Sequence, residues 1–259
     1  MIDFIATSTF GLEACVKREV IKLGFENVRT FDGRVEFTGD ESAIPKANLW
    51  LRCAGRVFVK MGEFKALSFE DLFQGTKALP WGDWIPVDGK FTVVGKSVKS
   101  TLHSVPDCQA IVKKAIVEKL KEKYEVDWFD ETGAEYTVQV ALLKDVATLT
   151  IDTSGSGLHK RGYRANALDA PLKETLAAAM VELSYWNKDR ILLDPFCGSG
   201  TIPIEAALIA RNIAPGLNRH FASEKWERVP EKLWKEERRR CYEAIDYDCM
   251  PKIYGSDID

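Results

Sequence analysis

The segment from Asp194 to Thr201 constrains the fold of this chain more than any other part of the sequence. The apolar run Ile191-Leu192-Leu193 ends at Asp194, two glycines follow with one residue between them, and an apolar helical pattern begins at Thr201. A buried strand, a tight glycine-containing loop and a helix in this order are typical of nucleotide-cofactor sites in α/β proteins. The segment therefore predicts the opening of a Rossmann-like sheet.

The same segment distinguishes between cofactors. A phosphate-binding loop requires a lysine where Gly200 stands, and a dinucleotide site requires a third glycine where Pro203 stands. S-adenosylmethionine has no phosphate, so it needs neither; Asp257, at the end of the next predicted strand, would hold its ribose hydroxyls. A glycine-rich turn without a ligand is the alternative. The residues expected to bind S-adenosylmethionine are Asp194, Pro195, Phe196, Cys197, Gly198, Ser199, Gly200, Thr201 and Asp257.

The first 65 residues show the pattern of a small α+β unit. Strand patterns at residues 2–6, 28–30, 34–37 and 56–64 alternate with helical patterns at 12–23 and 42–53. The turn signal Asp32-Gly33 joins the second and third strands as a hairpin. This β-α-β-β-α-β order predicts a ferredoxin-like unit.

A second α+β unit is expected over residues 66–154. Its helix begins at Ser68, where Asp71 completes a capping box, and residues 80–89 are expected to form a loop. A strand at 91–98, a helix after Pro106 and a hairpin of strands at 136–143 and 146–151 follow. Ser154-Gly155-Ser156-Gly157 is interpreted as a hinge that opens a linker over 155–170.

The last part of the chain, residues 171–259, carries the segment from Asp194 to Thr201, which we call the cofactor turn. Helices are expected at 172–183, 201–212 and 224–240, and strands at 191–193 and 252–256. The helix at 224–240 is charge-dense, with acid–base pairs four residues apart such as Glu224 and Arg228, so we expect it to face solvent while Trp226 and Trp234 pack. Cys197 is interpreted as a small packing residue.

Composition limits where the protein acts. The formal net charge of −3 does not suggest a surface that binds nucleic acid throughout, although local basic patches remain compatible with it. The six cysteines form no C-x-x-C pair and there are only three histidines, so a reduced cytoplasmic protein without a metal site is expected. The N-terminus lacks the pattern of a signal peptide, and no apolar run approaches the roughly 18 residues of a membrane helix.

Several segments resemble one family. Residues 194–201 resemble motif I of class I methyltransferases that act on exocyclic amino groups. Residues 88–90, 95–104, 152–164 and 170–176 resemble the THUMP-containing guanine-N2 methyltransferases of ribosomal RNA. The resemblance covers nearly the whole chain. It implies an α+β ferredoxin-like and THUMP region, with an RNA-binding THUMP module over 66–154, followed by the beginning of an α/β Rossmann-like methyltransferase domain.

The resemblance implies methyl transfer from S-adenosylmethionine to RNA, with guanine N2 of 23S ribosomal RNA as the expected target. Members of the family carry an Asn/Asp-Pro-Pro-Tyr catalytic loop, and this sequence has no Pro-Pro pair. The catalytic residues are therefore unassigned, and we expect a methyltransferase domain cut before that loop and inactive by itself. A DNA adenine-N6 methyltransferase and a non-catalytic RNA-binding protein are the alternatives.

Two basic segments are candidates for RNA contact. Residues 90–123 hold eight lysines against three acids, and within them the resemblance points to Lys96, Lys99, Ser100 and His103. Residues 159–164 combine cations with an aromatic ring, and Lys160, Arg161 and Arg164 are expected to contact RNA there. Solvated helix and linker surfaces are the alternative for both segments.

Overall fold

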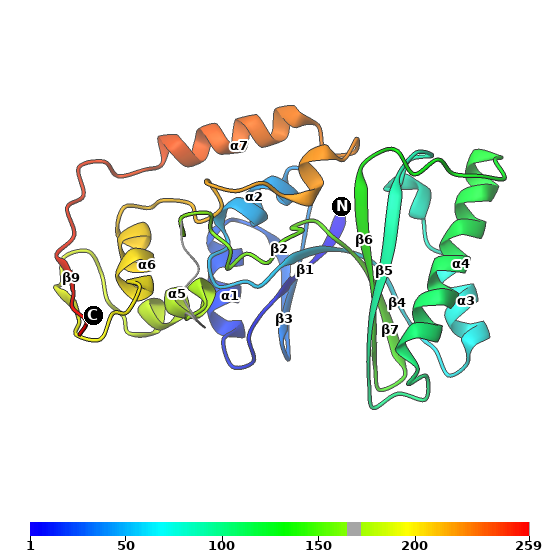
Figure 1. Ribbon diagram of the computed structural model, residues 1–259, viewed down its shortest axis with the longest axis horizontal. Coiled ribbons are helices and arrows are strands. Elements are labelled where there is room, and N and C mark those ends of the chain that lie inside the picture. The colour runs from blue at the N-terminus through cyan, green and yellow to red at the C-terminus, as the bar shows by residue number, and fades with distance from the viewer. Residues whose placement is uncertain (165–171, 259) are drawn as a thin grey trace.

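The N-terminal unit has the expected β-α-β-β-α-β order in the computed structural model, which describes residues 1–164 and 172–258 (Figure 1). The hairpin turns at Asp32 and Gly33, where Gly33 has a φ of +73°. The elements are β1 (Ile2–Thr7), α1 (Glu13–Lys22), β2 (Glu26–Phe31), β3 (Arg34–Gly39), α2 (Ala43–Trp50) and β4 (Val57–Lys65).

The second unit also follows the predicted pattern. Ser68 caps its first helix, because the Ser68 hydroxyl accepts a hydrogen bond of 3.1 Å from the Asp71 amide. Lys144 and Asp145 both have positive φ, as a tight hairpin turn requires. The elements are α3 (Phe69–Lys77), the short 3-10 turn η1 (Trp81–Asp83), β5 (Lys90–Val98), α4 (Val105–Tyr124), β6 (Glu135–Leu143) and β7 (Val146–Asp152).

The two units share one seven-stranded sheet, in the order β2-β3-β1-β4-β7-β6-β5. Strands β4 and β7 pair antiparallel and join them, a connection that the sequence did not predict. Phe4, Val59, Ile151 and Val138 lie in register across the sheet and belong to one buried core with α1 to α4. The helices therefore cover one face of the sheet, and the opposite face carries no helix from the described part of the chain.

The last part of the chain forms the predicted strand–turn–helix segment. Strands β8 (Leu192–Asp194) and β9 (Ile253–Gly255) pair in parallel, with Asp194 opposite Gly255. Parallel pairing through an intervening helix is the arrangement expected at the start of a Rossmann-like sheet. The remaining elements are α5 (Glu174–Leu183), α6 (Thr201–Ala210), the 3-10 turn η2 (Ala222–Lys225) and α7 (Glu231–Glu243).

Helix α7 lies along α2 of the N-terminal unit (Figure 1). It begins at Glu231 and not at 224, and Glu224 pairs with Arg238 at 2.6 Å instead of with Arg228. The expected solvated helix is therefore shorter and half-covered, because its buried face contacts the ferredoxin-like unit. Trp226 and Trp234 are buried, which confirms that both pack.

The predicted hinge at residues 154–157 is packed against the rest of the protein. The guanidinium of Arg219 donates to the carbonyls of Ser156 and Gly157, each at 2.6 Å, and the buried Ser154 hydroxyl donates to Asn48 at 2.6 Å. A guanidinium that bonds successive carbonyls holds this segment in the described state, and the hinge interpretation stays a prediction. Residues 165–170 of the predicted linker lie outside the described residues.

Two further observations concern burial and length. The expected loop at 80–89 contributes the fully buried side chains of Trp81 and Ile85 to the core. Among the described residues, none of the helices combines the length and apolarity that crossing a bilayer demands.

Candidate functional site

The glycine turn between β8 and α6 is open on its outer side. Gly198 and Gly200 have φ values of +49° and +75°, a region that L side chains rarely adopt. A Cβ at Gly198 would meet no described atom within 4 Å. The turn therefore presents bare backbone to a space that a ligand can enter, directly before the N-terminus of α6, whose free amides favour acceptor groups.

The two predicted acids meet at this turn. Asp194 ends β8, and its Oδ1 accepts a hydrogen bond of 3.3 Å from the Phe196 amide. Asp257 follows β9, and its Oδ2 accepts a hydrogen bond of 2.7 Å from the Gly198 amide. Because β8 and β9 pair in parallel, both carboxylates lie at the same edge of the small sheet. This is the shared edge that the cofactor prediction requires.

The other residues of the turn divide into packed and exposed positions. The Cys197 amide bonds to the Ser256 carbonyl at 3.0 Å, and the Cys197 sulfur lies 3.0 Å from where a Cβ on Gly255 would stand. Cys197 thus fills the space between the turn and β9, in keeping with a packing role. Phe196 projects into solvent with 88% of its side chain exposed.

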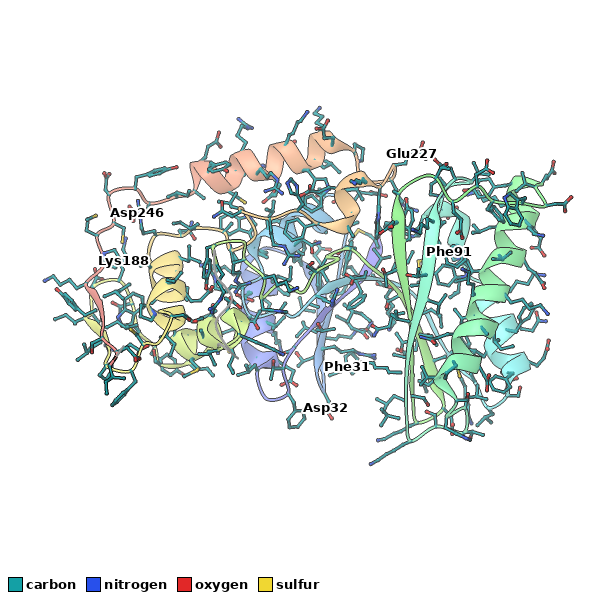
Figure 2. The ribbon with its side chains drawn as sticks, in the orientation of Figure 1. Phe31, Asp32, Phe91, Lys188, Glu227 and Asp246 are labelled. Carbon is teal, nitrogen blue, oxygen red and sulfur yellow. The ribbon has the colours of Figure 1, made fainter. Side chains whose placement is uncertain are left out.

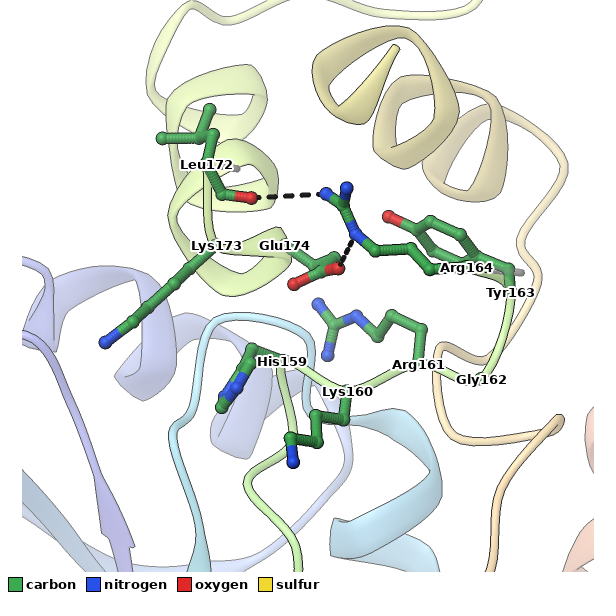
Figure 3. A pocket seen from close by; sticks show the side chains of 9 residues that line it. All are labelled: His159, Lys160, Arg161, Gly162, Tyr163, Arg164, Leu172, Lys173 and Glu174. Atoms are coloured by element: carbon green, nitrogen blue, oxygen red, sulfur yellow. Dashed lines mark hydrogen bonds and ion pairs between the residues drawn. The ribbon is translucent and has the colours of Figure 1, made fainter. Parts of the chain in front are cut away.

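Arg164 ties the turn to the preceding segment. Its guanidinium donates to Thr201 Oγ1 at 2.6 Å, to Ser199 Oγ at 3.1 Å and to Glu174 Oε1 at 2.5 Å. It also donates to the Leu172 carbonyl at 3.3 Å. Figure 3 draws this bond and the bond to Glu174 as dashed lines. Arg164 was predicted to contact RNA, and the structure instead places its guanidinium against the cofactor turn and the first residue of α5.

Arg161 is buried and therefore unsuited to direct RNA contact. Its guanidinium forms an ion pair with Glu205 of α6 at 3.2 Å, with side chains 2% and 0% exposed. It also donates to the carbonyls of Arg52 at 2.6 Å and Leu158 at 2.7 Å. These bonds join the ferredoxin-like unit, the backbone at Leu158 and α6. The sequence prediction for Arg161 needs correction, because charge pattern alone does not report burial.

Tyr163 and Lys160 flank this arginine differently. The Tyr163 hydroxyl donates to Glu205 Oε1 at 3.2 Å, and burial raises the pKa of Tyr163, so the hydroxyl keeps its proton. Lys160 is exposed, and burial lowers the pKa of the neighbouring His159. A cavity of about 460 Å³ is bounded, among the described residues, by 159–164 and 172–174 (Figure 3).

The other predicted RNA residues lie on β5 and the loop that follows it. Lys96, Lys99 and His103 are exposed. Ser100 is occupied by the turn itself, since its hydroxyl donates to the Val98 carbonyl and accepts from the Asp145 amide, both at 3.1 Å. Figure 1 places β5 far from α5 and α6, so the two predicted RNA segments form separate surfaces.

Several residues of the site were missed from the sequence. Glu174 and Glu205 pair with Arg164 and Arg161. The Arg52 carbonyl accepts a hydrogen bond from Arg161, and Arg219 holds the carbonyls of the segment before it. Glu205 had a sequence signal, because it is the lone acid in the apolar helix Thr201–Ala210, where only a paired charge is tolerated. Arg52 and Arg219 had none, since their partners are distant in sequence, and nothing in the residues around Glu174 singled out its pairing with Arg164 ten positions earlier.

Three family models match successive parts of the chain. The ferredoxin-like domain named for RlmL matches residues 3–58, the THUMP domain matches 66–152, and the "RMKL-like, methyltransferase domain" matches 161–259. Solved structures resemble the chain over its whole length. A crystal structure from Listeria monocytogenes, described as a predicted N6-adenine-specific DNA methylase, is 56% identical with a TM-score of 0.97 over 100% of this chain and 68% of that chain. The chain belongs to the THUMP-containing, RlmL-like methyltransferase family.

Other relatives within the family carry RNA-directed names. "Putative RNA methyltransferase YpsC" of Bacillus subtilis is 57% identical over 98% of this chain and 66% of its own length. The "Ribosomal RNA large subunit methyltransferase K/L" of Psychromonas ingrahamii is 36% identical over 100% of this chain and 35% of its own length. The chain thus spans about two thirds of one curated relative and about one third of the other.

A further family member was crystallised with a ligand. The structure described as SMU.472, a putative methyltransferase complexed with SAH, is 46% identical with a TM-score of 0.95, over 100% of this chain and 68% of that chain. S-adenosylhomocysteine is the product that S-adenosylmethionine leaves after methyl transfer. The comparison agrees with the cofactor class predicted from the glycine turn.

Proposed function

We propose that this protein is an S-adenosylmethionine-dependent RNA methyltransferase that modifies the exocyclic N2 of a guanine in 23S ribosomal RNA. The observation that carries the proposal is the meeting of Asp194, Gly198 and Asp257 at one edge of a parallel strand pair, in a chain that also carries a THUMP module. The open backbone at Gly198 fits a ligand that approaches without a side chain in its way. When bound there, S-adenosylmethionine would supply the methyl group.

The residues of this chain would bind S-adenosylmethionine and orient it for methyl transfer. Asp194 and Asp257 would accept hydrogen bonds from polar groups of the ligand, and the amides at the start of α6 would hold a carboxylate. Arg164 would keep Ser199 and Thr201 in the geometry of the bound turn. The target guanine would have to leave its stack to reach the methyl donor, and the rate would come mainly from alignment of the amine with the methyl group.

RNA is favoured over DNA as the substrate. The THUMP match and the RNA-directed names of two relatives support RNA, against the DNA-directed description of the Listeria structure. The six free cysteines suit a reducing compartment, and we place the protein in the cytoplasm. Competition of structured RNA against duplex DNA for the protein is expected to leave RNA bound.

The proposal is tested by transfer of labelled methyl groups. The protein expressed from its complete gene would be incubated with labelled S-adenosylmethionine and 23S ribosomal RNA from cells that lack the gene. We expect the label in RNA, recovered as N2-methylguanosine by mass spectrometry of the nucleosides. Label in N6-methyladenosine of DNA would favour the DNA alternative, and a protein that binds RNA without any transfer would favour the non-catalytic one.

A further inference from the structure

A second concave surface lies on the helix-free face of the seven-stranded sheet. It encloses about 770 Å³ between the β2–β3 hairpin on one side and strands β5, β6 and β7 on the other. Figure 2 shows Phe31 and Asp32 at the tip of this hairpin. We call this surface the sheet groove; its lining includes Phe31, Arg34, Phe58, Lys96, Gln139 and Thr150.

The floor of the sheet groove combines apolar side chains such as Phe58 with buried hydroxyl groups. Along β7, Thr148 and Thr150 are 6% and 5% exposed and face away from the helices. Gln139 lies opposite Thr150 on β6, so it shares that face. A sheet that simply faced water would not bury these groups, and a sheet that faced a core would not place hydroxyls there. The floor therefore offers hydroxyl and amide groups beside an apolar contact surface.

Two buried polar atoms of the sheet groove have no partner among the described residues. These are Thr150 Oγ1 and Arg34 Nε. Buried donors and acceptors in native proteins are nearly always satisfied, because each unsatisfied group costs about 1–3 kcal/mol. Both residues line the sheet groove. A polar ligand seated there would satisfy both atoms.

Charge in the sheet groove favours an anion. Glu36 is surrounded by Arg29 at 3.6 Å, Arg34 at 3.1 Å and Lys60 at 3.2 Å. Glu63 adds the only other acid of this network within the described residues, at 3.2 Å from Arg34. Lys96 lies beyond the network and its charge is exposed. Asp32 also lines the groove, so four cations (Arg29, Arg34, Lys60 and Lys96) stand against three acids (Asp32, Glu36 and Glu63). The surplus of one positive charge favours a phosphate backbone.

An aromatic ring stands at the rim of the sheet groove. Phe31 is 41% exposed, and the guanidinium of Arg34 lies 5.0 Å from its ring centroid. Exposed aromatic rings and guanidinium planes are the groups on which unpaired bases stack. The volume falls within the roughly 300–1,000 Å³ of sites that enclose ligands of nucleotide size. An A-form duplex hides its base faces, so an unpaired segment suits the groove better.

We propose that the sheet groove binds unpaired nucleotides of the RNA substrate, at a distance from the cofactor turn. This inference rests on the proposed RNA specificity and adds the place and the strand state of the contact. The hydroxyl of Thr150 and Nε of Arg34 meet polar groups of the nucleotides, Phe31 stacks on a base, and Lys96 faces a phosphate.

The sharpest test removes the unpartnered hydroxyl. Thr150→Val keeps the shape of the side chain and breaks no described hydrogen bond, so Tm is expected to stay the same or rise. Binding of a fluorescein-labelled, eight-nucleotide, mixed-sequence single-stranded RNA, measured by fluorescence polarisation, is expected to weaken about three- to tenfold. Thr92→Val, an exposed position on the same strand as Lys96 but outside the groove, is the matched control and should leave affinity unchanged.

A second pair of variants tests the rim and the charge. Phe31→Ala is expected to weaken single-strand binding about tenfold through lost stacking. Lys96→Glu should lower affinity several-fold and reduce its salt dependence, whereas Lys113→Glu, the same change on the helical face, should do neither. The blunt duplex of the same RNA is expected to bind more weakly than the single strand and to respond less to the groove variants.

The outcomes separate this inference from the proposed function. If the wild-type chain binds the single strand and all groove variants bind equally well, the groove inference fails while RNA specificity stands. Stronger binding to the duplex, or equal losses for Lys96→Glu and Lys113→Glu, would also overturn it. If the wild type binds no RNA, both the groove and the proposed substrate class fail.

Discussion

Arg161 and Arg164 lie three residues apart in one basic segment, yet the fold gives them different tasks. Arg161 forms a buried ion pair with Glu205, whereas Arg164 donates hydrogen bonds to the hydroxyls of Ser199 and Thr201 in the cofactor turn. The sequence predicted the cations and their place between the THUMP module and the turn. It could not predict their partners, because Glu205 is 44 residues from Arg161 and Ser199 is 35 residues from Arg164.

Loss of Arg164 is expected to loosen the turn without unfolding the protein. Arg164→Ala should weaken S-adenosylhomocysteine binding about tenfold in calorimetry, because charge-assisted hydrogen bonds that hold Ser199 and Thr201 are removed. Arg164→Lys should restore little of it, since an ammonium cannot span the same acceptors. Arg190 is an exposed arginine just before β8, so Arg190→Ala serves as the control and should leave the affinity unchanged. Equal affinity in Arg164→Ala and wild type would contradict this role.

The buried pair is expected to show the opposite behaviour. Glu205→Ala leaves the guanidinium of Arg161 buried beside no carboxylate, which should lower the free energy of unfolding by about 3–5 kcal/mol in chemical denaturation. The double variant Arg161→Met with Glu205→Leu should recover most of that loss. A single variant as stable as the wild type would show that the pair is not sealed from water.

Among the elements, helices α1 and α5 enclose a half-buried carboxyl pair. Glu19 of α1 accepts hydrogen bonds from the Arg52 and Cys53 amides at 3.0 and 3.1 Å. Burial, with a smaller contribution from Glu182 of α5, raises the pKa of Glu19 to about 7. Burial also raises the pKa of Glu182, against the opposing charges of Arg52, Arg18 and Lys22. The stability of the packing between α5 and the ferredoxin-like unit therefore depends on the protonation of these two carboxyl groups.

Stability should fall as the pH rises through this range. Unfolded glutamate titrates near 4.5, so between that pH and about 7 the folded state holds more protons than the unfolded state and loses stability with each step upward. Glu182→Gln removes the neighbouring negative charge, and at pH 8 it should gain about 1–2 kcal/mol, or a few degrees in Tm, over wild type. At pH 5 the wild type and Glu182→Gln should have the same Tm. The exposed change Glu26→Gln should have no such effect, and a parallel pH profile for Glu182→Gln would contradict the linkage.

At the scale of the whole molecule, local sequence patterns predicted the helices and strands but not how they pack together. Strands β1 to β7 were expected within one or two residues, because alternation and turn residues are local signals. The β4–β7 pairing that merges two units into one sheet brings together strands more than 80 residues apart, and no local signal encodes it. The return of α7 onto α2 was missed for the same reason.

The candidate site likewise has one part that local sequence signals predicted and another part that depends on contacts between distant segments. The strand–turn–helix geometry was predictable because its glycines, acid and strand are contiguous in sequence, and Asp257 could be placed by assuming the next parallel strand. The role of these residues in cofactor binding stays a prediction. The contact of Arg164 with Ser199 and the sheet groove depend on segments that are distant in sequence. Sequence could therefore suggest the ligand of the turn but not the residues that hold the turn in place.

Calorimetric titration of S-adenosylhomocysteine tests the central claim most directly, with the protein expressed from its complete gene. Asp194→Ala and Gly198→Val should each weaken binding about tenfold or more, because one removes an acceptor and the other puts a branched side chain where bare backbone faces the ligand space. Asp189→Ala, an exposed acid in the segment before β8, should bind as wild type does. Unchanged affinity in both turn variants would contradict the assignment of this turn to the methyl donor.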